Sequence, residues 1–384
     1  MRILVLNWRS ILSRNAGGAE IHCYEIFKRI ANKGNSVHLI ASCNDSTKSK
    51  NTVIDKIQVL HTTKNEMIYP LSSLLFLRRI SPNHFDVIIE DISKFPMFWP
   101  LLLSKFFSRP FVIIVHHLHG KTLFKELSSP LNILLYFFEL FGLKFYSFFN
   151  PFVVAVSEST KCELISLGFD KNRIKVISNG LNFDTEWRPF PKKKVIYPLI
   201  IYFGRVKKYK RLDHLIKAVK QISLKVHGVK VKIAGRGDAE AYEELFTLAN
   251  NLGLGNVVEF YGEVDEKKKV DILQSAWVYA IASMKEGFGI SVIEAQAFGL
   301  PIVAYNVPGI RDSVNHLKSG ILVKDGDLNA FADALAIICE NRALREKLEK
   351  GALENASRYN WDKSSDEFLS LLNELNFQNG KARN

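Results

Sequence analysis

The segment KEGFGISVIE, residues 285–294, places an acidic side chain on either side of a glycine-broken apolar turn. Glu286 and Glu294 have seven residues between them, and the apolar residues after Gly289 are typical of a helix that begins there. A helix opened by glycine presents unbonded N–H groups and the positive end of its dipole, which suits a phosphate. Carboxylates accept hydrogen bonds from hydroxyls. The segment therefore fits a phosphate between a sugar and a ribose, while a surface helix with an acidic first turn remains the alternative.

A run of cations follows the apolar segment Leu199–Phe203 within a single loop. Its members are Arg205, Lys207, Lys208, Lys210 and Arg211. Arginine offers phosphate a planar fork and lysine offers a point charge. Such a run is often only a solvated face. Its place directly after a strand, where open parallel sheets bind ligands, favours an anion site.

Short apolar runs alternate with helical patterns along the whole chain, which predicts parallel sheets covered by helices on both faces. The expected strands of the first half are Ile3–Leu6, Val37–Ala41, Val87–Ile89, Phe111–Val115 and Val153–Val156. Those of the second half are Leu199–Phe203, Lys230–Ala234, Val257–Tyr261, Val278–Ile281 and Pro301–Ala304. Between the halves, residues 184–198 contain three prolines and a lysine triplet and are interpreted as a linker. We therefore expect two Rossmann-like domains, residues 1–188 and 189–384.

The composition restricts the class of partner and the compartment. A net charge of +13 and a pI near 9.4 favour nucleic acid, nucleotide phosphates or an acidic membrane surface. The four cysteines are scattered and form no C-x-x-C pair, so a reducing cytoplasm is the simplest location. The apolar segment Leu131–Phe149 is interrupted by Asn132, Glu139 and Lys144. We therefore reject a membrane span and expect an amphipathic helix, either buried or lying on a bilayer surface.

The chain resembles a family 4 retaining glycosyltransferase of the GT-B fold over nearly its full length. The motifs that carry the resemblance are Gly17-Gly-Ala-Glu20, Val115-His116, Ala155-Val-Ser157, Asn179-Gly180, Phe203-Gly-Arg205, Lys210, Ala234-Gly-Arg-Gly237, Tyr261-Gly262, Glu286-Gly-Phe-Gly289, Glu294 and Pro301-Ile-Val-Ala304. The resemblance implies two Rossmann-like domains facing across a cleft. The first would bind the acceptor and the second the nucleotide sugar, with a last helix at about 361–377 packing back on the first.

The resemblance also implies which residues act. The catalytic residues would be His116, Glu286, Arg205 and Lys210. The donor would be bound by Gly17, Gly18, Arg205, Lys210, Gly262, Val264, Phe288, Gly289, Ile290 and Glu294. Arginine, lysine and the glycine-rich backbone would hold the diphosphate. Glu294 would take the ribose hydroxyls, Glu286 the transferred sugar and the loop at Gly262 the base, while His116 would lie near the sugar and acceptor.

Retention in this family is usually explained by same-face attack assisted by the leaving phosphate, with Glu286 as a covalent nucleophile the lesser alternative. We expect no cofactor and no metal, because Asp325-Gly-Asp327 is typical of a turn and no acid or cysteine near His116 completes a ligand set. Two positions depart from the usual family pattern. Lys210-Arg211 occupies a position where many family members have Lys-Gly, and the extra arginine is expected to add a cation beside the phosphates. His116-His117 occupies a position where many have His-Asp, which is a change on the acceptor side.

The expected function is thus transfer of a hexose from a UDP- or GDP-type sugar to a glycan, glycolipid or lipid-linked acceptor. The protein would be cytoplasmic, and the basic charge and the aromatic segment suggest contact with an anionic membrane. The alternatives are a non-catalytic nucleotide-sugar-binding protein, a phosphorylase or epimerase of related fold, and a basic nucleic-acid-binding protein. For the last, the sequence offers no recognised binding motif.

Overall fold

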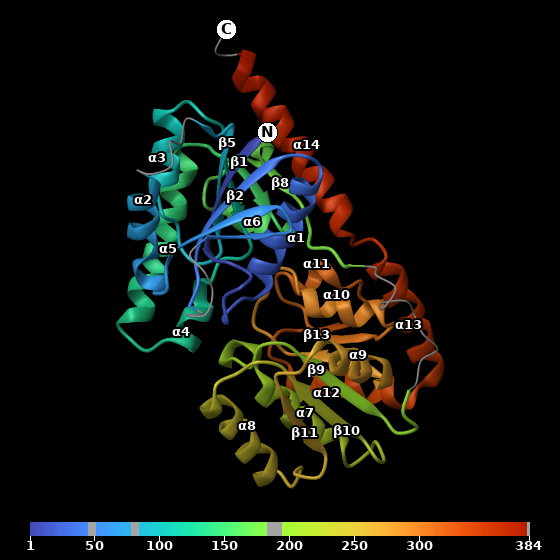
Figure 1. Cartoon of the computed structure of the whole chain (residues 1–384). Helices are drawn as coiled ribbons and strands as arrows, with labels where there is room; N and C mark the ends of the chain where they lie inside the picture. Colours follow the sequence, from blue (N-terminus) through green and yellow to red (C-terminus); the bar gives the residue numbers. More distant parts are fainter. Residues whose placement is uncertain (45–50, 78–83, 183–193, 382–384) are drawn as a thin grey trace. The chain divides into compact units, whose positions relative to one another are not determined.

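A computed structural model describes residues 1–44, 51–77, 84–182 and 194–381, which form two compact units (Figure 1). Unit 1 comprises Met1–Gly120, Ile133–Gly180 and Asn360–Asn384, and unit 2 comprises Lys121–Asn132 and Leu181–Tyr359. Each unit is an α/β fold built on a parallel sheet, so the predicted fold class is confirmed. The expected boundary between residues 188 and 189 lies outside the described residues.

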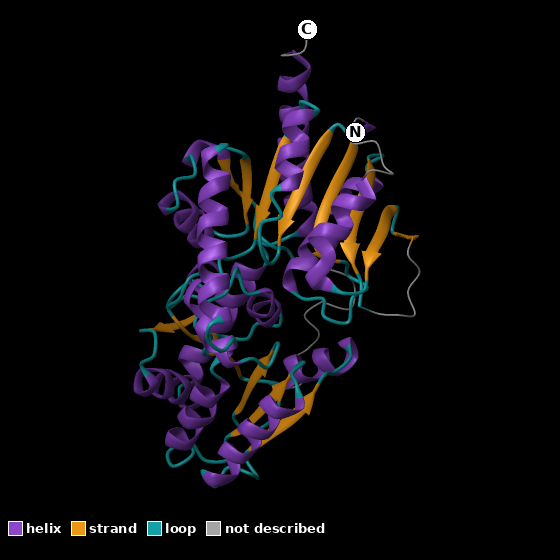
Figure 2. Ribbon diagram, turned by 90° about the vertical axis from the view of Figure 1, so that its left-hand side faces the viewer, coloured by secondary structure: helices purple, strands orange, loops and turns teal. Residues whose placement is uncertain are grey.

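The sheet of unit 1 has the strand order β3-β4-β2-β1-β5-β6-β7-β8. Figure 2 shows its strands side by side with helices packed on the sheet. Its strands are β1 (Arg2–Arg9), β2 (Ser36–Ser42), β3 (Asn51–Ile54), β4 (Ile57–Thr63), β5 (Val87–Ile92), β6 (Phe111–Val115), β7 (Phe152–Ala155) and β8 (Ile174–Val176). All pairs are parallel except β3 with β4. The central strands are buried on both faces, which explains their continuous apolar sequences.

Helices cover both faces of this sheet (Figure 1). They are α1 (Gly18–Asn32), α2 (Tyr69–Leu77), α3 (Trp99–Phe106), α5 (Leu131–Phe148), α6 (Glu158–Ser166) and α14 (Trp361–Lys381). One core cluster joins the sheet to α1 and α14, where Phe27 meets Phe368 edge to face. The cluster on the other face includes Tyr69 of α2, Leu101 of α3 and Tyr146 of α5. The last helix thus belongs to the core of unit 1.

Helix α5 differs from its neighbours in how much apolar surface it leaves exposed. By length and composition it could cross a bilayer, with a mean hydropathy of 1.3. Only 28% of it is buried inside the protein, so most of its apolar surface is not covered by the rest of the fold. Its inner side packs on the sheet through Leu143 and Tyr146. The exposed side carries several of the chain's phenylalanines.

The sheet of unit 2 is entirely parallel, with the order β11-β10-β9-β12-β13-β14. Its strands are β9 (Leu199–Phe203), β10 (Lys230–Ala234), β11 (Val258–Gly262), β12 (Val278–Ile281), β13 (Ile302–Tyr305) and β14 (Gly320–Val323). Its helices are α4 (Leu123–Glu126), α7 (Leu212–Ile222), α8 (Ala239–Asn251), α9 (Glu266–Ser275), α10 (Ile290–Ala297), α11 (Ile310–Ser313), α12 (Leu328–Glu340) and α13 (Arg342–Ala356). The predicted strands agree with these to within one residue at each end.

One segment of the N-terminal half belongs to unit 2, which the sequence did not indicate. Helix α4 contacts the 3-10 helix η6 (Lys208–Lys210). There the backbone N–H of Tyr209 donates to the Glu126 carboxylate over 3.0 Å. The contact helps to fix the loop that carries Lys210.

Candidate functional site

The candidate residues of unit 2 cluster where the strand order of its sheet reverses. From β9 the chain moves to β10 and β11 on one side, and then returns to β12 on the other side of β9. Open α/β sheets bind ligands outside the carboxyl ends of their strands at such a switch point. The loop after β9 carries Arg205 and Lys210. The loop after β12 carries Glu286 and leads to α10.

Close backbone packing holds these loops together. The N–H of Gly204 donates to the carbonyl of Ala234, and the N–H of Gly235 donates to that of Gly262. A Cβ on Gly235 would lie 1.8 Å from the Gly204 oxygen, so the second loop must have glycine here. Gly262 itself has φ +64, and Val264 two residues on is half-buried against the core. The glycine motifs after β9, β10 and β11 therefore make one continuous rim.

Two buried tyrosines hold the Arg205 loop from beneath. The hydroxyl of Tyr202 donates to the Arg205 carbonyl over 2.8 Å, and that of Tyr279 donates to the Phe203 carbonyl over 2.6 Å. Burial raises the pKa of both phenols, so they stay protonated as donors. The Arg205 side chain is exposed on this supported loop. It is therefore placed to meet a ligand from solvent.

Lys210 and Glu286 form a nearly buried ion pair, with Nζ and Oε1 2.5 Å apart. Burial alone would lower the pKa of Lys210, but the Glu286 carboxylate raises it above its ordinary value. Burying two charges is costly unless further partners satisfy them. The pair is thus a preformed polar site at the switch point, with a cation for an anionic group and a carboxylate for hydroxyls.

The helix predicted from KEGFGISVIE is present as α10, which begins at Ile290 after Gly289 at φ +90. Phe288 is buried and meets Tyr359 edge to face, which anchors the turn. The N-cap residue of α10 is Gly289, which has no side chain to accept the N–H groups of the first turn. This end of α10 therefore suits an anion.

Gly309 supports the same turn, a role that the sequence did not reveal. Its φ is +82, and a Cβ there would lie 2.2 Å from the carbonyl oxygen of Glu286. The N–H of Glu286 also donates to the Pro308 carbonyl over 3.1 Å. The Pro-Gly pair thus fixes the backbone of the acidic residue.

Glu294 lies one turn inside α10 and has a partner that the sequence analysis missed. Lys269 of α9 donates to its carboxylate over 2.8 Å, and only 6% of the lysine side chain is exposed. Burial alone would lower the pKa of Lys269, but Glu294 raises it. Lys269 looked like one member of the exposed run EKKKV, and only the packing of α9 beside α10 distinguishes it. Burial raises the pKa of Glu294, and the charge of Lys269 opposes that rise and orients the carboxylate.

The expectation that Arg211 adds a cation beside the phosphates stays a prediction, and the structure gives its side chain a different partner. Arg211 has φ +49, the left-handed conformation that glycine adopts most easily. Its guanidinium donates to Asp325 and lies 5.7 Å from the Tyr305 ring centroid. Asp325 belongs to the predicted turn, whose Asp327 caps α12. The side chain is therefore engaged at that turn.

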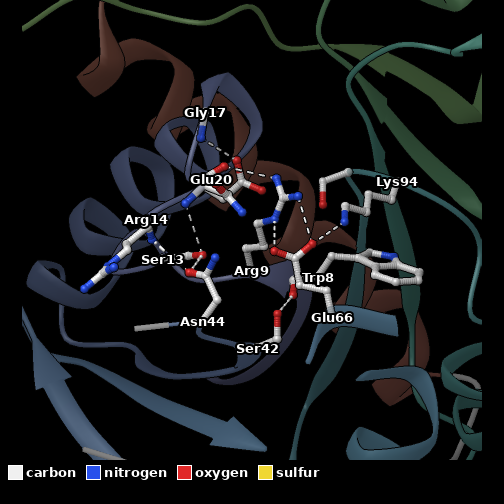
Figure 3. A network of polar contacts seen from close by, with 12 residues as sticks. Trp8, Arg9, Ser13, Arg14, Gly17, Glu20, Ser42, Asn44, Glu66 and Lys94 are labelled. Carbon is white, nitrogen blue, oxygen red and sulfur yellow. Dashed lines mark hydrogen bonds and ion pairs between the residues drawn. The ribbon is translucent and has the colours of Figure 1, made fainter. Parts of the chain in front are cut away.

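In unit 1, the loop after β1 lies at the corresponding switch point, since β2 and β5 flank β1. Figure 3 shows how polar side chains shape this loop. Arg9 donates to Glu66 twice, over 2.6 and 2.8 Å, and Lys94 pairs with the same carboxylate. At the end of the loop, Glu20 accepts the N–H of Gly17 over 2.7 Å. Gly17 is thus held in extended backbone just before α1, which begins at Gly18.

His116 follows β6 and is buried beside Asp91 of β5, with Nε2 and Oδ1 2.7 Å apart. Burial alone would lower the pKa of His116, but the Asp91 carboxylate raises it above its ordinary value. His22 packs edge to face on His116, with the ring centroids 5.1 Å apart. Burial, and then the charge of His116, lowers the pKa of His22 to about 3. A histidine that stays neutral therefore lies against one whose protonated form is favoured.

The other two histidines of this loop serve different contacts. The Glu139 carboxylate of α5 accepts the N–H groups of His119 and Gly120 over 2.7 and 2.8 Å, and it also lies 2.9 Å from Nδ1 of His119. The rings of His117 and His119 are 4.8 Å apart. Within the described residues, no group of three His, Cys, Asp or Glu side chains could hold a metal ion.

Two family models match the chain and between them cover most of it. The model described as Glycosyltransferase Family 4 matches residues 16–185, and Glycosyl transferases group 1 matches residues 183–355. A D-inositol 3-phosphate glycosyltransferase of Xylanimonas cellulosilytica is 31% identical over 233 residues, 57% of this chain and 56% of that protein. An uncharacterised glycosyltransferase of Methanocaldococcus jannaschii is 30% identical over 57% of this chain and 59% of its own. The chain thus spans about half the length of the curated relatives it matches.

Solved structures match over almost the entire length. Sucrose-phosphate synthase from Thermosynechococcus elongatus has a TM-score of 0.80 at 20% identity, covering 97% of this chain and 98% of its own. Anabaena HepE in complex with UDP and glucose has a TM-score of 0.75 at 19% identity, covering 97% and 100%. At such identities the likeness establishes the fold alone.

Proposed function

Because the chain belongs to the family 4 glycosyltransferases and has the GT-B fold, we propose that it is a retaining hexosyltransferase using a nucleoside diphosphate sugar. The observation that carries the proposal is the nearly buried Lys210–Glu286 pair at the switch point of unit 2, beside the start of α10 that Gly289 opens. A diphosphate sugar needs cations and N–H groups for its phosphates and a carboxylate for its hydroxyls. These three kinds of group occur together here.

Each group of unit 2 then has a role towards the donor. Arg205, Lys210 and the N–H groups at Phe288, Gly289 and Ile290 would bind the diphosphate. Glu286 would accept from hydroxyls of the transferred sugar. Glu294, oriented by Lys269, would accept from the ribose hydroxyls. The rim at Gly262 and Val264 would receive the base. We expect the base to be uracil or guanine. HepE, which has the same fold, is solved with UDP and glucose.

The charges suit the transition state better than the ground state. As the bond between sugar and phosphate stretches, negative charge grows on the leaving diphosphate and positive charge on the sugar. Cations fixed before the reaction stabilise the developing anion without reorganisation. Lys210 is held in this way by Glu286. We propose that these cations do the work that a metal ion does in other glycosyl transfers, and that the same-face attack retains the anomeric configuration.

We further propose that unit 1 serves the acceptor, with His116 as its acid–base or electrophilic group, and that the glycine loop at Gly17 and Gly18 contributes to binding the diphosphate of the donor. The buried Asp91 carboxylate favours the protonated form of His116 by raising its pKa. The acceptor would be a glycan, a glycolipid or a lipid-linked sugar. The exposed apolar side of α5 and the net charge of +13 support a protein that lies peripherally on a cytoplasmic membrane face.

The test follows UDP- and GDP-sugars by proton NMR with candidate acceptors, with and without a metal chelator. We expect an α-linked donor to yield an α-linked product, and turnover to persist in the chelator. Glu286→Ala and Arg205→Ala should abolish transfer. Lys210→Met should lower kcat/KM by about 100-fold or more. Lys208→Met is the matched control, because Lys208 lies two residues away and is exposed, pairing with Glu244.

Unchanged turnover in Glu286→Ala would refute the site assignment, and product of inverted configuration would refute retention. Loss of turnover in chelator, restored by a divalent ion, would refute metal independence. Binding of a nucleotide sugar without turnover with any acceptor would favour the non-catalytic binding protein.

A further inference from the structure

A cavity of about 250 Å³ lies in unit 1 at the end of the sheet away from the histidines. Phe111 and Phe152, the first residues of β6 and β7, form part of its wall, so it opens at the amino ends of the strands. His116 follows the opposite, carboxyl end of β6. The cavity is therefore separate from the candidate site described above.

The lining of the cavity is cationic. Lys105, Arg109 and Arg173 contribute to it, and none of its lining residues, all within the described part of the chain, is acidic. Arg173 is held rigidly, because it donates to the Asn150 carbonyl over 2.9 Å and its guanidinium lies 4.6 Å from the Phe152 ring centroid. Amide side chains of α14, such as that of Gln378, complete the polar wall. Such a lining is complementary to a phosphate group.

Three strongly exposed phenylalanines are sequence neighbours of residues that line the cavity. Phe106 is next to Lys105, Phe148 is next to the lining residue Phe149, and Phe377 is next to Gln378. Their exposed fractions are 80%, 84% and 64%, the largest of any phenylalanine in the described residues. Three elements distant in sequence, α3, α5 and α14, thus each carry one such exposed ring directly beside a lining residue in the sequence.

The apolar surface continues along α5. Its exposed side carries a stripe at intervals of four and three residues, the spacing of one helix face. The stripe consists of Leu134, Phe138, Phe141, Phe145 and Phe148. The stripe ends at Phe148, next to the lining residue Phe149. Helix α5 is held to the loop after β6 through Glu139 and to β5 through Tyr146. The helix can therefore lie on a bilayer surface without leaving the fold.

We propose that this cavity binds the phosphate headgroup of an anionic lipid while Phe106, Phe148 and Phe377 enter the acyl boundary of the same leaflet. Apolar side chains at the interface and cations at the headgroup level are the two contributions that hold a peripheral protein on an anionic membrane. A bilayer supplies both chemistries over one surface. A soluble phosphate would use the cations alone, and a second copy of this chain, with its high positive charge, would be repelled from them.

The proposal extends the proposed peripheral localisation but is independent of the transfer reaction, because vesicle binding is measured without substrate. The experiment measures co-sedimentation with vesicles of phosphatidylcholine alone and with phosphatidylglycerol added, at low and high salt. We expect strong, salt-sensitive binding to the anionic vesicles only. Lys105→Gln with Arg173→Gln should weaken it about 30-fold, taking about fivefold for each cation. Phe106→Ser with Phe148→Ser should weaken it about tenfold for each side chain.

The matched control is Lys225→Gln with Lys347→Gln, which removes the same charge from exposed positions of unit 2. It should bind nearly as the wild type does. Arg173 also holds a loop through the Asn150 carbonyl, so the double variant of Lys105 and Arg173 could unfold. Lys105→Gln alone changes only an exposed side chain and therefore keeps the test valid in that case. We expect about a fivefold loss from it.

Several results would overturn the proposal. An equal loss in the control pair would mean that only net charge matters. Vesicle binding that survives the phenylalanine pair would mean that these rings do not enter the membrane. If that pair also changes the oligomeric state of the protein, the surface would be assigned to another copy of the chain. A thermal shift with inorganic phosphate that requires Lys105 and Arg173, without any vesicle binding, would assign the cavity to a soluble phosphate.

Discussion

Replacing Asp91 with asparagine tests the charge state of His116 directly. Both side chains are buried, and Nε2 of His116 lies 2.7 Å from Oδ1 of Asp91. Asparagine keeps an acceptor oxygen and the volume but removes the charge. A hydrogen bond to a charged group is worth about 1.5–3 kcal/mol and a neutral one about 0.5–1.5 kcal/mol. The change should therefore cost the imidazolium about 1–2 kcal/mol, and its population at a given pH should fall about 5- to 30-fold.

The assay is the NMR titration of His116 together with thermal unfolding at several pH values. Because the folded state raises the pKa of His116, its stabilising contribution is fully present below the pKa of an unfolded histidine, about 6.5, and is lost as the pH rises through the folded value. The wild type should thus exceed Asp91→Asn in stability by more at pH 6 than at pH 9. An equal difference at both values, or an unmoved His116 titration, would refute the reasoning.

Glu90→Gln is the matched control. Glu90 is the preceding residue of β5 and equally buried, but it points to the other face of the sheet and accepts from the Tyr146 hydroxyl. Burial raises its pKa to about 7. Its ionisation therefore destabilises the fold increasingly from about pH 4.5 to pH 7, and the control should flatten that part of the stability curve. The titration of His116 should stay in place.

Two further predictions concern unit 2. Gly309→Ala should lose about 2 kcal/mol of stability or more and bind nucleotide less well, because its Cβ would strike the Glu286 carbonyl at a positive φ. Gly326→Ala is the control, because Gly326 has φ +77 but open space around its Cβ, and it should lose only the stability that the positive φ costs an alanine. Equal Tm values for both variants would contradict the contact between the Cβ at position 309 and the Glu286 carbonyl. Lys269→Met should raise the pKa of Glu294, whose burial is then uncompensated, and raise the KM for the nucleotide sugar about tenfold or more with little change in kcat. An unchanged KM would show that Glu294 does not meet the donor.

The fold and part of the site could be predicted because their signals are local. Continuous apolar runs identified the strands, and Gly289 before an apolar periodicity identified the start of α10. The backbone of Gly235 lies against Gly204, which explains why two separate glycine motifs occur after neighbouring strands.

The rest depends on which elements become neighbours. Nothing in EKKKV separates Lys269 from the exposed lysines beside it, since only the packing of α9 brings it to Glu294. In the sequence, Asp91 is only a polar residue at the end of a buried strand. The pairing of β5 with β6 is what brings His116 beside it. For Arg211, the sequence shows only the charge, whereas its left-handed backbone and the turn at Asp325 decide where the guanidinium goes.

The most direct test of the central claim is calorimetric titration of the purified protein with UDP, GDP, ADP and their glucose conjugates, in buffer containing a metal chelator. We predict that one base is selected, that its diphosphate binds with one site per chain, and that Lys210→Met removes most of the affinity while Lys208→Met keeps it. If no nucleotide diphosphate or nucleotide sugar binds the folded protein, or if Lys210→Met binds as the wild type does, the donor site is not at the Lys210–Glu286 pair.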